Sequence, residues 1–480
     1  MNRREFCRLA ALTPIAAAAP AAWAGSGPLL DRPPLEVTVD ARRTAQEIAG
    51  FGASGAFHMA DILRRYPHGE RARILDLLFS PTRGAGLTIV RNIIPPEDGK
   101  QPPILSASGI PDWTGDAGQV WLMREAAQRG CTRFISSAWT PPPRMKTNHS
   151  IIGGRLRPDA YEAYAEYLAA YVEGYRRRHG LEIYAISPQN EPDVTVKYAS
   201  CFWNGEDYRR FMAGHLGPVW RRRKIAAQIF LGENSEWTEA PARPSLEDAA
   251  AREAVGVVAS HAYFGDNHVP EVGLAPRTGV FTAAQRYGKP VWQTEVSAFN
   301  RNDPGMDDAL YWAKLVHFHL AQDNVAAWVY WWLISPGPNR EALISLDPAD
   351  GGWMGNKRLF ALGQFSRFVR PGAVRVAATA NPAPQIYCSA YRAGKQTVIV
   401  AINAQPWFRP GTRPGPGGGP ALAAAVFRLP GVSASVVHAW RTSIFEDLAP
   451  AQAPQLEHAS SGTNFQATLL PSSVTTFVVE

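Results

Sequence analysis

The chain has 480 residues, of which 46% are hydrophobic and 19% charged. This composition excludes a wholly disordered protein and allows a large core with a second, smaller domain. The formal net charge is +7, but the basic runs at 176–180 and 221–224 fall at the ends of predicted helices, where cations complement the helix dipole. We therefore expect no nucleic-acid partner.

Residues 1–24 have the pattern of an export signal. The twin arginines Arg3 and Arg4 precede an alanine-rich apolar run that closes on a small-x-small pattern at 22–24, which is typical of a bacterial twin-arginine leader. The run is too short and too rich in alanine for a good membrane span. The sequence predicts a periplasmic or extracellular protein without stable membrane insertion after cleavage; a plain secretory signal or an uncleaved anchor is the alternative.

The cysteines and histidines do not indicate a metal site. Beyond the leader, Cys131, Cys201 and Cys388 are an odd number without metal-ligand spacing, so we expect small buried thiols. On a predicted helix, His317 and His319 are two residues apart and point to different faces. The sequence predicts neither a metal nor a cofactor.

From residue 49 to 370, short β-rich runs alternate with amphipathic segments. The tyrosines of the segment 159–179 recur every three to four residues, which predicts a helix whose tyrosine stripe packs in the core. Strands are expected at 48–54, 87–94, 132–139, 182–189, 227–233, 257–264, 290–297 and 326–334, and helices at 70–80, 117–130, 159–179, 206–224, 245–254 and 306–322. Eight such units predict a (β/α)8 barrel over 49–370. A doubly wound sheet is less favoured, because no G-x-G-x-x-G follows the first strand.

The remaining segments predict a β-sandwich side domain. Residues 371–480 contain short alternating runs separated by turn residues, as in an antiparallel β-sandwich. Residues 33–48 also alternate and are expected to add a strand, so that both chain ends build this domain. The Pro/Gly-rich stretch 406–421 predicts a mobile loop.

Polar and aromatic residues stand at the carboxyl ends of the predicted barrel strands. A barrel brings these ends together at one mouth, where it carries its chemistry. From strand two to strand eight they are Arg91, Asn92, Trp139, Asn190, Glu191, Glu233, Asn234, His261, Tyr263, Glu295, Trp331 and Trp332.

Two of these residues, Glu191 and Glu295, follow strands four and seven and should face each other across the mouth. Paired carboxylates without a metal or cofactor motif are typical of glycoside hydrolysis, in which one carboxyl is protonated and the other ionised. A separation of about 5–5.5 Å between the two carboxyl groups would give retention of anomeric configuration. Glu233, Glu236 and Glu239 are rival carboxylates without a matching motif, and we expect them on the surface or in loops.

The chain resembles glycoside hydrolase family 30 in six stretches that occur in the family's order. They are "GFGASGA" (50–56), "SSAWTPPPRMKTN" (136–148), "ISPQNEP" (186–192), "HAYF" (261–264), "WQTEVS" (292–297) and "ALGQFSRFVRPG" (361–372). The resemblance spans the barrel from its first strand to its last helix. It implies a retaining barrel enzyme with a β-sandwich built from both chain ends.

The resemblance also implies the roles of the acidic centre. Glu191 would be the general acid/base and Glu295 the nucleophile. Asn190 would hydrogen-bond the sugar 2-hydroxyl, and Arg91 would stabilise the carboxylates. The alternatives are a barrel-end salt bridge for the two glutamates, a structural cap for Asn190 and a purely structural role for Arg91, as also for His261 and Tyr263.

Four further residues would complete the site by the same resemblance. His261 and Tyr263 would lie near the nucleophile and orient it or the sugar. Trp139 and either Trp331 or Trp332 would shape the site where the sugar ring stacks. Strand alternation predicts that Trp331 and Trp332 do not both face the sugar.

The substrate is less clearly indicated than the reaction. Family 30 includes xylan-cleaving enzymes, and its glucuronoxylanases place an arginine soon after strand eight; here Arg340 comes later, which argues against strict glucuronate dependence. We expect a monomer that acts on a polysaccharide or oligosaccharide, with xylan as the leading β-glycan. A β-1,6-galactanase or glucanase, an exo-acting β-glycosidase and a non-catalytic carbohydrate-binding protein are the alternatives.

Overall fold

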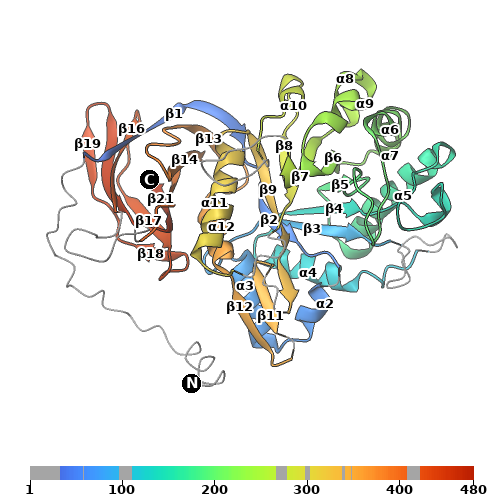
Figure 1. Ribbon diagram of the computed structural model, residues 1–480, viewed down its shortest axis with the longest axis horizontal. Coiled ribbons are helices and arrows are strands. Elements are labelled where there is room, and N and C mark those ends of the chain that lie inside the picture. The colour runs from blue at the N-terminus through green and yellow to red at the C-terminus, as the bar shows by residue number, and fades with distance from the viewer. Residues whose placement is uncertain are drawn as a thin grey trace.

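The computed structural model describes residues 33–57, 59–96, 111–265, 278–297, 303–337, 341–347, 349–407 and 422–480. The predicted leader, Arg340 and most of the Pro/Gly-rich stretch 406–421 lie outside the described residues. The described chain forms a barrel and a large sheet beside it (Figure 1). Along this part of the chain, no helix has the length and apolar character required to span a membrane.

Eight strands close the predicted parallel barrel, each pairing with the next and the last with the first. All eight strands expected from the sequence are present. They are β2 (Gly50–Ser54), β3 (Ile89–Ile94), β4 (Arg133–Ala138), β5 (Ala185–Ser187), β6 (Gln228–Trp237), β7 (Val257–Gly265), β8 (Val291–Glu295) and β9 (Val325–Trp332).

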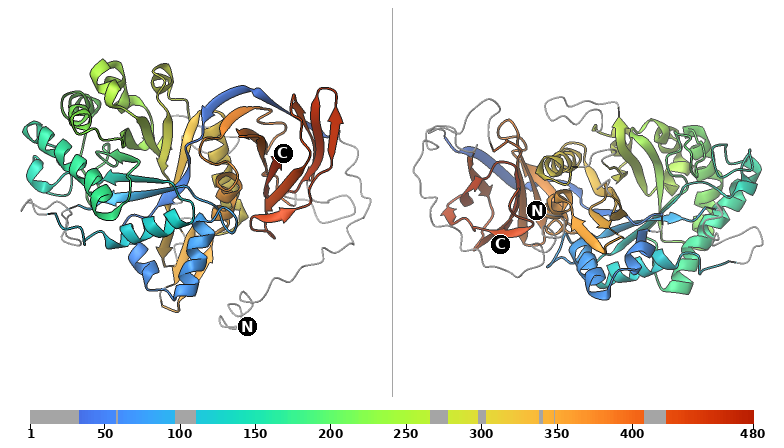
Figure 2. Two further views of the ribbon diagram at one scale, coloured as in Figure 1. Left: turned by 180° about the vertical axis from the view of Figure 1, so that it is seen from behind. Right: turned by 60° about the horizontal axis from the view of Figure 1, so that its bottom comes forward.

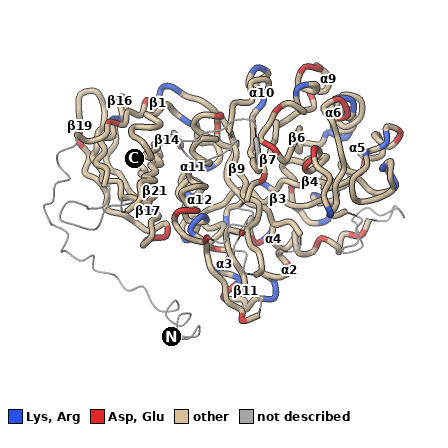
Figure 3. The backbone as a smooth tube through the Cα atoms, in the orientation of Figure 1, with Lys and Arg blue, Asp and Glu red and all other residues tan. Residues whose placement is uncertain are grey.

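Helices surround the barrel, and Lys, Arg, Asp and Glu positions fall along them (Figure 3). They are α2 (Met59–Arg64), α3 (His68–Phe79), α4 (Ala117–Gln128), η1 (Pro143–Met145), η2 (Pro158–Ala160), α5 (Tyr161–Gly174), η3 (Tyr175–His179), α6 (Gly205–Phe211), η4 (Met212–Leu216), α7 (Gly217–Arg223), η5 (Ala240–Ala242), α8 (Arg243–Glu247), α9 (Ala249–Ala254), α10 (Thr282–Arg286), α11 (Met306–Ala321) and α12 (Lys357–Ser366). The tyrosine stripe of α5 is buried, as predicted. Among the basic runs, Arg222 pairs with Glu162 and Glu166 of α5.

The helices differ from the expected ranges in several places, and α12 was expected only from the resemblance, as the last helix of the barrel. The short helices α2 and α10 were not predicted, because five or six residues show too little periodicity. The helix expected at 245–254 is divided at Asp248, whose backbone is extended and whose side chain accepts from the N–H groups of Ala250 and Ala251. Asp248 therefore caps a new helix instead of continuing the old one.

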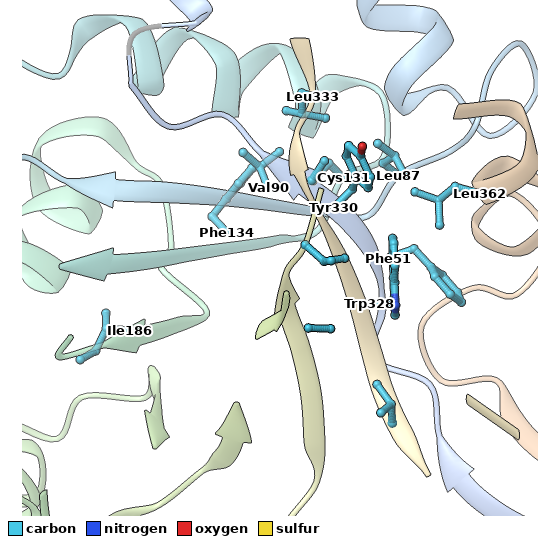
Figure 4. Packing of buried hydrophobic residues seen from close by; sticks show 14 of the residues in the cluster. Phe51, Leu87, Val90, Cys131, Phe134, Ile186, Trp328, Tyr330, Leu333 and Leu362 are labelled. Atoms are coloured by element: carbon cyan, nitrogen blue, oxygen red, sulfur yellow. The ribbon is translucent and has the colours of Figure 1, made fainter. Parts of the chain in front are cut away.

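Each barrel strand is buried on both faces. Val90, Phe134 and Trp328 point outwards and pack among the helices (Figure 4), whereas alternating neighbours such as Ile89 and Ile135 form a separate cluster inside the barrel. Because side chains alternate, residues two positions after this inner cluster form the next layer towards the carboxyl ends. That layer is where the polar site lies.

The side domain is a ten-stranded sheet built from both chain ends, as predicted. Its order is β18-β17-β21-β15-β14-β13-β1-β16-β20-β19. The strands are β1 (Leu35–Glu47), β13 (Val374–Ala378), β14 (Ile386–Ala393), β15 (Gln396–Asn403), β16 (Ala423–Pro430), β17 (Val437–Thr442), β18 (Ala449–Ala451), β19 (Leu456–Ala459), β20 (Gly462–Leu469) and β21 (Ser473–Val479). The sheet is antiparallel except where β1 runs parallel to β16. Its halves enclose a core that includes Val39, Phe427 and Phe477.

The other face of this sheet packs on the barrel through α11 and α12, which lie between the two (Figure 2). The ring of His317 on α11 packs against Tyr387, and Thr476 donates to the backbone oxygen of Gln364 on α12 at 2.7 Å. His319, two residues along α11, instead accepts from Trp328 of the barrel at 3.1 Å. The two histidines therefore point to different faces, as predicted.

A small third sheet, which was not predicted, lies between β9 and α12. It consists of β10 (Ile334–Pro336), β11 (Ile344–Asp347) and β12 (Gly352–Gly355). Trp353 donates to Glu70 at 2.8 Å, and Tyr66 donates to the backbone oxygen of Gly352 at 3.1 Å. These contacts fix the sheet to the segment around α2 and α3.

Candidate active site

Arg91 is the centre of the polar cluster at the carboxyl ends of the barrel strands. It stands two residues after Ile89, and its side chain is fully buried. One terminal nitrogen donates to Glu295 at 2.6 Å and the other to Asn190 at 2.6 Å. Its Nε and a terminal nitrogen donate to the two carboxylate oxygens of Glu233 at 3.2 and 3.3 Å. One guanidinium therefore holds side chains from β6, from the end of β8 and from the segment that follows β5.

Asn190 and Glu191 leave β5 in a backbone conformation that turns them into the mouth. Asn190 N–H donates to Ala138 O of β4 at 2.7 Å, and Glu191 N–H donates to Glu233 O of β6 at 2.9 Å. Glu191 has φ of +46° and Glu233 has φ of +58°, in the left-handed region that glutamate seldom adopts. Such backbone strain persists where neighbouring strands enforce it and is concentrated at functional sites.

The two sequence-predicted residues of β7 contact the two central glutamates. Tyr263 OH donates to Glu295 Oε1 at 2.8 Å, while Arg91 holds the other oxygen of Glu295. His261 is fully buried, and its Nδ1 lies 3.2 Å from Glu191 Oε1. Its Nε2 lies 3.8 Å from Glu295 and 3.9 Å from Glu233, so that the imidazole stands among three carboxyl groups.

The surroundings shift the charge states of this cluster. Burial raises the pKa of Glu295, and the Glu191 carboxylate adds to the rise, against His261 and Arg91. Burial opposes the charged form of Glu233, but Arg91 and His261 outweigh it and lower its pKa. Burial would lower the pKa of His261, yet the carboxylates of Glu295 and Glu191 raise it. Glu233 is therefore held ionised, and His261 binds a proton more readily than a free imidazole.

The two central carboxyl groups are close together. A carboxylate oxygen of Glu191, one of Glu295 and a ring nitrogen of His261 all lie within 4.8 Å of one another. A divalent cation could use these donor types, but the guanidinium of Arg91, 2.6 Å from Glu295, already supplies positive charge there and would repel a second cation. We assign no metal to this cluster.

Aromatic rings form one wall beside the cluster. Trp139 lies over the Arg91 guanidinium at 4.8 Å, and its ring centroid is 5.9 Å from that of Trp331. Trp331 and Trp332 do not alternate as in a regular strand: their rings stack with centroids 5.0 Å apart. The cause is a bulge, because successive residues of β2 pair with Tyr330 and Trp332 and leave Trp331 as an extra residue. Which of the two faces the sugar stays a prediction.

Glu233 stands among the predicted strand-end residues, but the sequence analysis gave it no role because no motif matched it. We expected it in a loop or on the surface, but it is fully buried against Arg91. The available signal was the same as for Glu191, an apolar run that ends at a carboxylate. Glu239 was also expected outside the core; instead it is buried and accepts from the N–H groups of Ala283 and Ala284 at the start of α10. Glu236 is exposed, as expected.

The motif at 136–148 contains a buried lysine that positions the loop after β4. Lys146 Nζ donates to Thr140 Oγ1 and to Ser200 O, both at 2.7 Å, and burial lowers its pKa to about 8. It thereby ties this loop to the one that follows β5. Cys201, next to Ser200, is a free buried thiol, as are the other two cysteines of the described residues, in agreement with prediction.

Comparisons with known proteins identify the family. The model of O-glycosyl hydrolase family 30 matches residues 89–345. A glucuronoxylanase of Bacillus subtilis is 31% identical over 370 residues, covering 75% of this chain and 77% of that protein. An endo-1,6-β-D-glucanase of Neurospora crassa is 24% identical over 366 residues, covering 70% and 73%.

Solved structures agree over nearly the whole chain. A family 30 subfamily 8 xylanase from Clostridium acetobutylicum superposes with a TM-score of 0.75 at 28% identity, covering 93% of this chain and 99% of that one. The catalytic domain of a family 30 xylanase from Talaromyces cellulolyticus gives 0.76 at 25% identity, covering 93% and 100%. With its barrel, its side sheet and its paired carboxylates in the matched region, the chain belongs to glycoside hydrolase family 30 and is an O-glycosyl hydrolase.

Proposed function

We propose that the protein is an exported, retaining β-glycoside hydrolase that cleaves a xylan-type β-glycan by double displacement. Glu191 is the general acid/base and Glu295 the nucleophile. The observation that carries the proposal is the pair of carboxyl groups with oxygens within 4.8 Å of each other, because this spacing suits direct attack by one carboxylate and leaves little room for an intervening water.

In the first step, a Glu295 oxygen bonds to the anomeric carbon while the glycosidic bond breaks. The proton of Glu191 passes to the departing oxygen, so that the leaving sugar departs as an alcohol. Arg91 and Tyr263 each hold one oxygen of Glu295. They orient the carboxylate, and the guanidinium favours the ionised form that the attack requires.

In the second step, water releases the sugar from the ester on Glu295. Glu191, now ionised, takes a proton from the water, whose oxygen bonds to the anomeric carbon as the ester bond breaks. Both glutamates then return to their starting states. Because each displacement inverts the anomeric carbon, the product retains its configuration.

The remaining predicted residues shape the sugar site in this proposal. Asn190 is fixed by Arg91 at 2.6 Å and is placed to hydrogen-bond the 2-hydroxyl. Trp139, over the Arg91 guanidinium, and Trp331 are buried, while Trp332 is half-buried and stacks on Trp331. Trp332 is therefore the ring of this pair with more surface available to a sugar.

Xylan is favoured as the substrate because the glucuronoxylanase relative is more than 30% identical and the two xylanase structures cover almost the entire chain. The β-1,6-glucanase relative, at 24% identity, supports a β-1,6-glucan as the second candidate. Export through the leader and action as a monomer complete the proposal.

Product analysis of the purified mature protein tests these assignments. The panel contains glucuronoxylan, arabinoxylan, β-1,6-galactan, β-1,6-glucan and aryl β-glycosides, with Glu295→Gln as the control. We expect xylo-oligosaccharides that are absent from the control, and NMR of the first product should show the β-anomer. Products from β-1,6-glucan alone would discard xylan, and an initial α-anomer would discard retention. Sugar binding without turnover of any panel member would favour the carbohydrate-binding alternative.

A further inference from the structure

A third carboxylate, Glu233, stands behind the two proposed catalytic glutamates. Its side chain is fully buried, with no exposed surface, so it cannot contact a sugar in this structure. Its contacts are instead with the groups that contact Glu191 and Glu295. Arg91 binds both of its oxygens, and His261 Nε2 lies 3.9 Å from one of them.

The charges of the cluster give Glu233 a specific effect. The Arg91 guanidinium and the carboxylates of Glu233 and Glu295 together carry one net negative charge. Beside them stands the pair of Glu191 and His261, whose facing atoms are 3.2 Å apart and which can share protons. A buried net negative charge favours protons on this pair.

We propose that Glu233 is a positioning residue whose buried charge holds the Arg91 guanidinium in place and keeps the Glu191–His261 pair protonated. The proposal rests on the proposed function, in which Glu191 must deliver a proton to the leaving group. The Glu233 carboxylate is thus a counter-ion of Arg91 whose negative charge keeps the proton on the Glu191–His261 pair as the pH rises. It acts through its neighbours and not on the substrate.

Other ionisable groups face Glu233 from the surrounding elements, and none of those described replaces its charge. Tyr208 of α6 faces Glu233, and Tyr263 of β7 faces Glu295 and Glu191. Burial raises the pKa of each phenol well above its usual range, so both are neutral. Arg91 binds Glu233 directly, His261 lies 3.9 Å from it, and Glu295 shares the Arg91 guanidinium with it. Glu191 contacts it through the backbone, by donating its N–H to Glu233 O. Removal of the Glu233 charge would therefore leave the cluster with no net charge, because Arg91 and Glu295 balance each other.

The test is the pH profile of kcat/KM for the wild type, Glu233→Gln and Glu233→Asp, on whichever aryl β-glycoside or oligosaccharide the wild type hydrolyses. The glutamine keeps the backbone oxygen that accepts from Glu191 N–H but removes the charge. We expect its alkaline limb to move to lower pH by about one unit, while Glu233→Asp keeps the limb near its wild-type position. An unmoved limb in Glu233→Gln, or a shift to higher pH, would overturn the proposal.

Glu239→Gln is the matched control, since Glu239 is another buried glutamate, two residues after the end of β6, but binds the start of α10. Its pH profile should equal that of the wild type, and an equal shift in both variants would also overturn the proposal. Thermal unfolding establishes that each variant is folded.

A second measurement does not depend on turnover. NMR titration of the imidazole signals, with the His261 signal identified by its loss in His261→Asn, should show a lower titration midpoint for His261 in Glu233→Gln than in the wild type. An unchanged midpoint would overturn the proposal even if the variant is inactive. If the wild type itself cleaves no glycoside, the proposed function fails, and this titration still decides the electrostatic role of Glu233.

Discussion

Two arginines, Arg91 and Arg358, are among the largest side chains buried completely in this protein. Both belong to the barrel, and both contact carboxylates and aromatic rings. Arg91 lies inside the barrel, at its mouth. Arg358 lies on α12, outside the barrel strands, and donates to Tyr330 of β9. The comparison shows how a buried charge that holds a fold together differs from one that supports a reaction.

A single carboxylate balances the positive charge of Arg358. It pairs with one carboxylate, Asp308, at 2.8 Å, and donates to Tyr330 OH and Glu341 O at 2.7 Å. A further nitrogen donates to Asp303 O at 2.9 Å. This arginine joins α11, α12 and β9 in one neutral, hydrogen-bonded group, which is the arrangement that a structural ion pair requires.

The negative charge around Arg91 exceeds its own positive charge. Two carboxylates bind it directly, a third lies across His261, and two of the three glutamates have left-handed backbone conformations. Like charges and strain both cost stability. Burial alone therefore does not separate the two arginines; an excess of like charge and a strained backbone mark the functional one.

The largest expected effect is the loss of turnover in Glu295→Gln. Without the nucleophile, kcat/KM for a xylo-oligosaccharide should fall by more than about 10⁴-fold. The free energy of unfolding should not fall, because the change removes one of three crowded carboxylates. Initial rates and urea denaturation measure the two effects, and a variant that kept turnover would refute the assignment of Glu295.

Arg358→Met should give the opposite result. It leaves Asp308 buried without its partner, so the free energy of unfolding should fall by about 3–5 kcal/mol, while kcat of the folded fraction at low temperature stays near the wild-type value. Denaturant unfolding at 10 °C measures the loss. Adding Asp308→Asn should recover part of it; a large loss of kcat in the folded single variant would break the contrast between the two arginines.

Arg91→Lys tests whether geometry at the mouth matters beyond charge. A lysine cannot reproduce the fork that holds Glu295, Asn190 and Glu233 together. We expect kcat/KM to fall by about 10²-fold, with a smaller change in thermal stability than in Arg358→Met. Steady-state kinetics and a melting curve measure both, and full activity would show that charge alone suffices.

His317 extends the comparison to a basic group that is buried between α11 and the side sheet, where the described part of the chain provides no counter-ion. Burial lowers its pKa to about 4, from 6.5. A folded-state pKa below the unfolded value means that stability is complete above about pH 6.5 and is lost as the pH falls towards 4. Between pH 7 and 4.5 this site should cost about 2–3 kcal/mol.

His317→Gln provides the control for this acid sensitivity. Since glutamine does not titrate, the fall in unfolding free energy between pH 7 and 4.5 should be smaller in the variant by that amount. Equal pH dependence in the two proteins would show that His317 is not a source of the acid sensitivity.

Much of the fold could be predicted from local patterns. All eight barrel strands, most of the long helices and the contribution of both chain ends to the side sheet follow from periodicity and turn residues. Local patterns could not give the small third sheet, the division at Asp248 or the parallel pairing of β1 with β16. These features depend on contacts between segments that are distant in the sequence.

The sequence by itself determined the type of each strand-end residue and, through barrel topology, that these residues meet at one mouth. It therefore placed Arg91, Asn190, Glu191, His261 and Glu295 in one cluster. Only the tertiary structure decided which partner each one has. Side-chain contacts depend on register and on the turn after each strand, which is why Glu233 proved to be buried against Arg91 and why a bulge stacked Trp331 on Trp332.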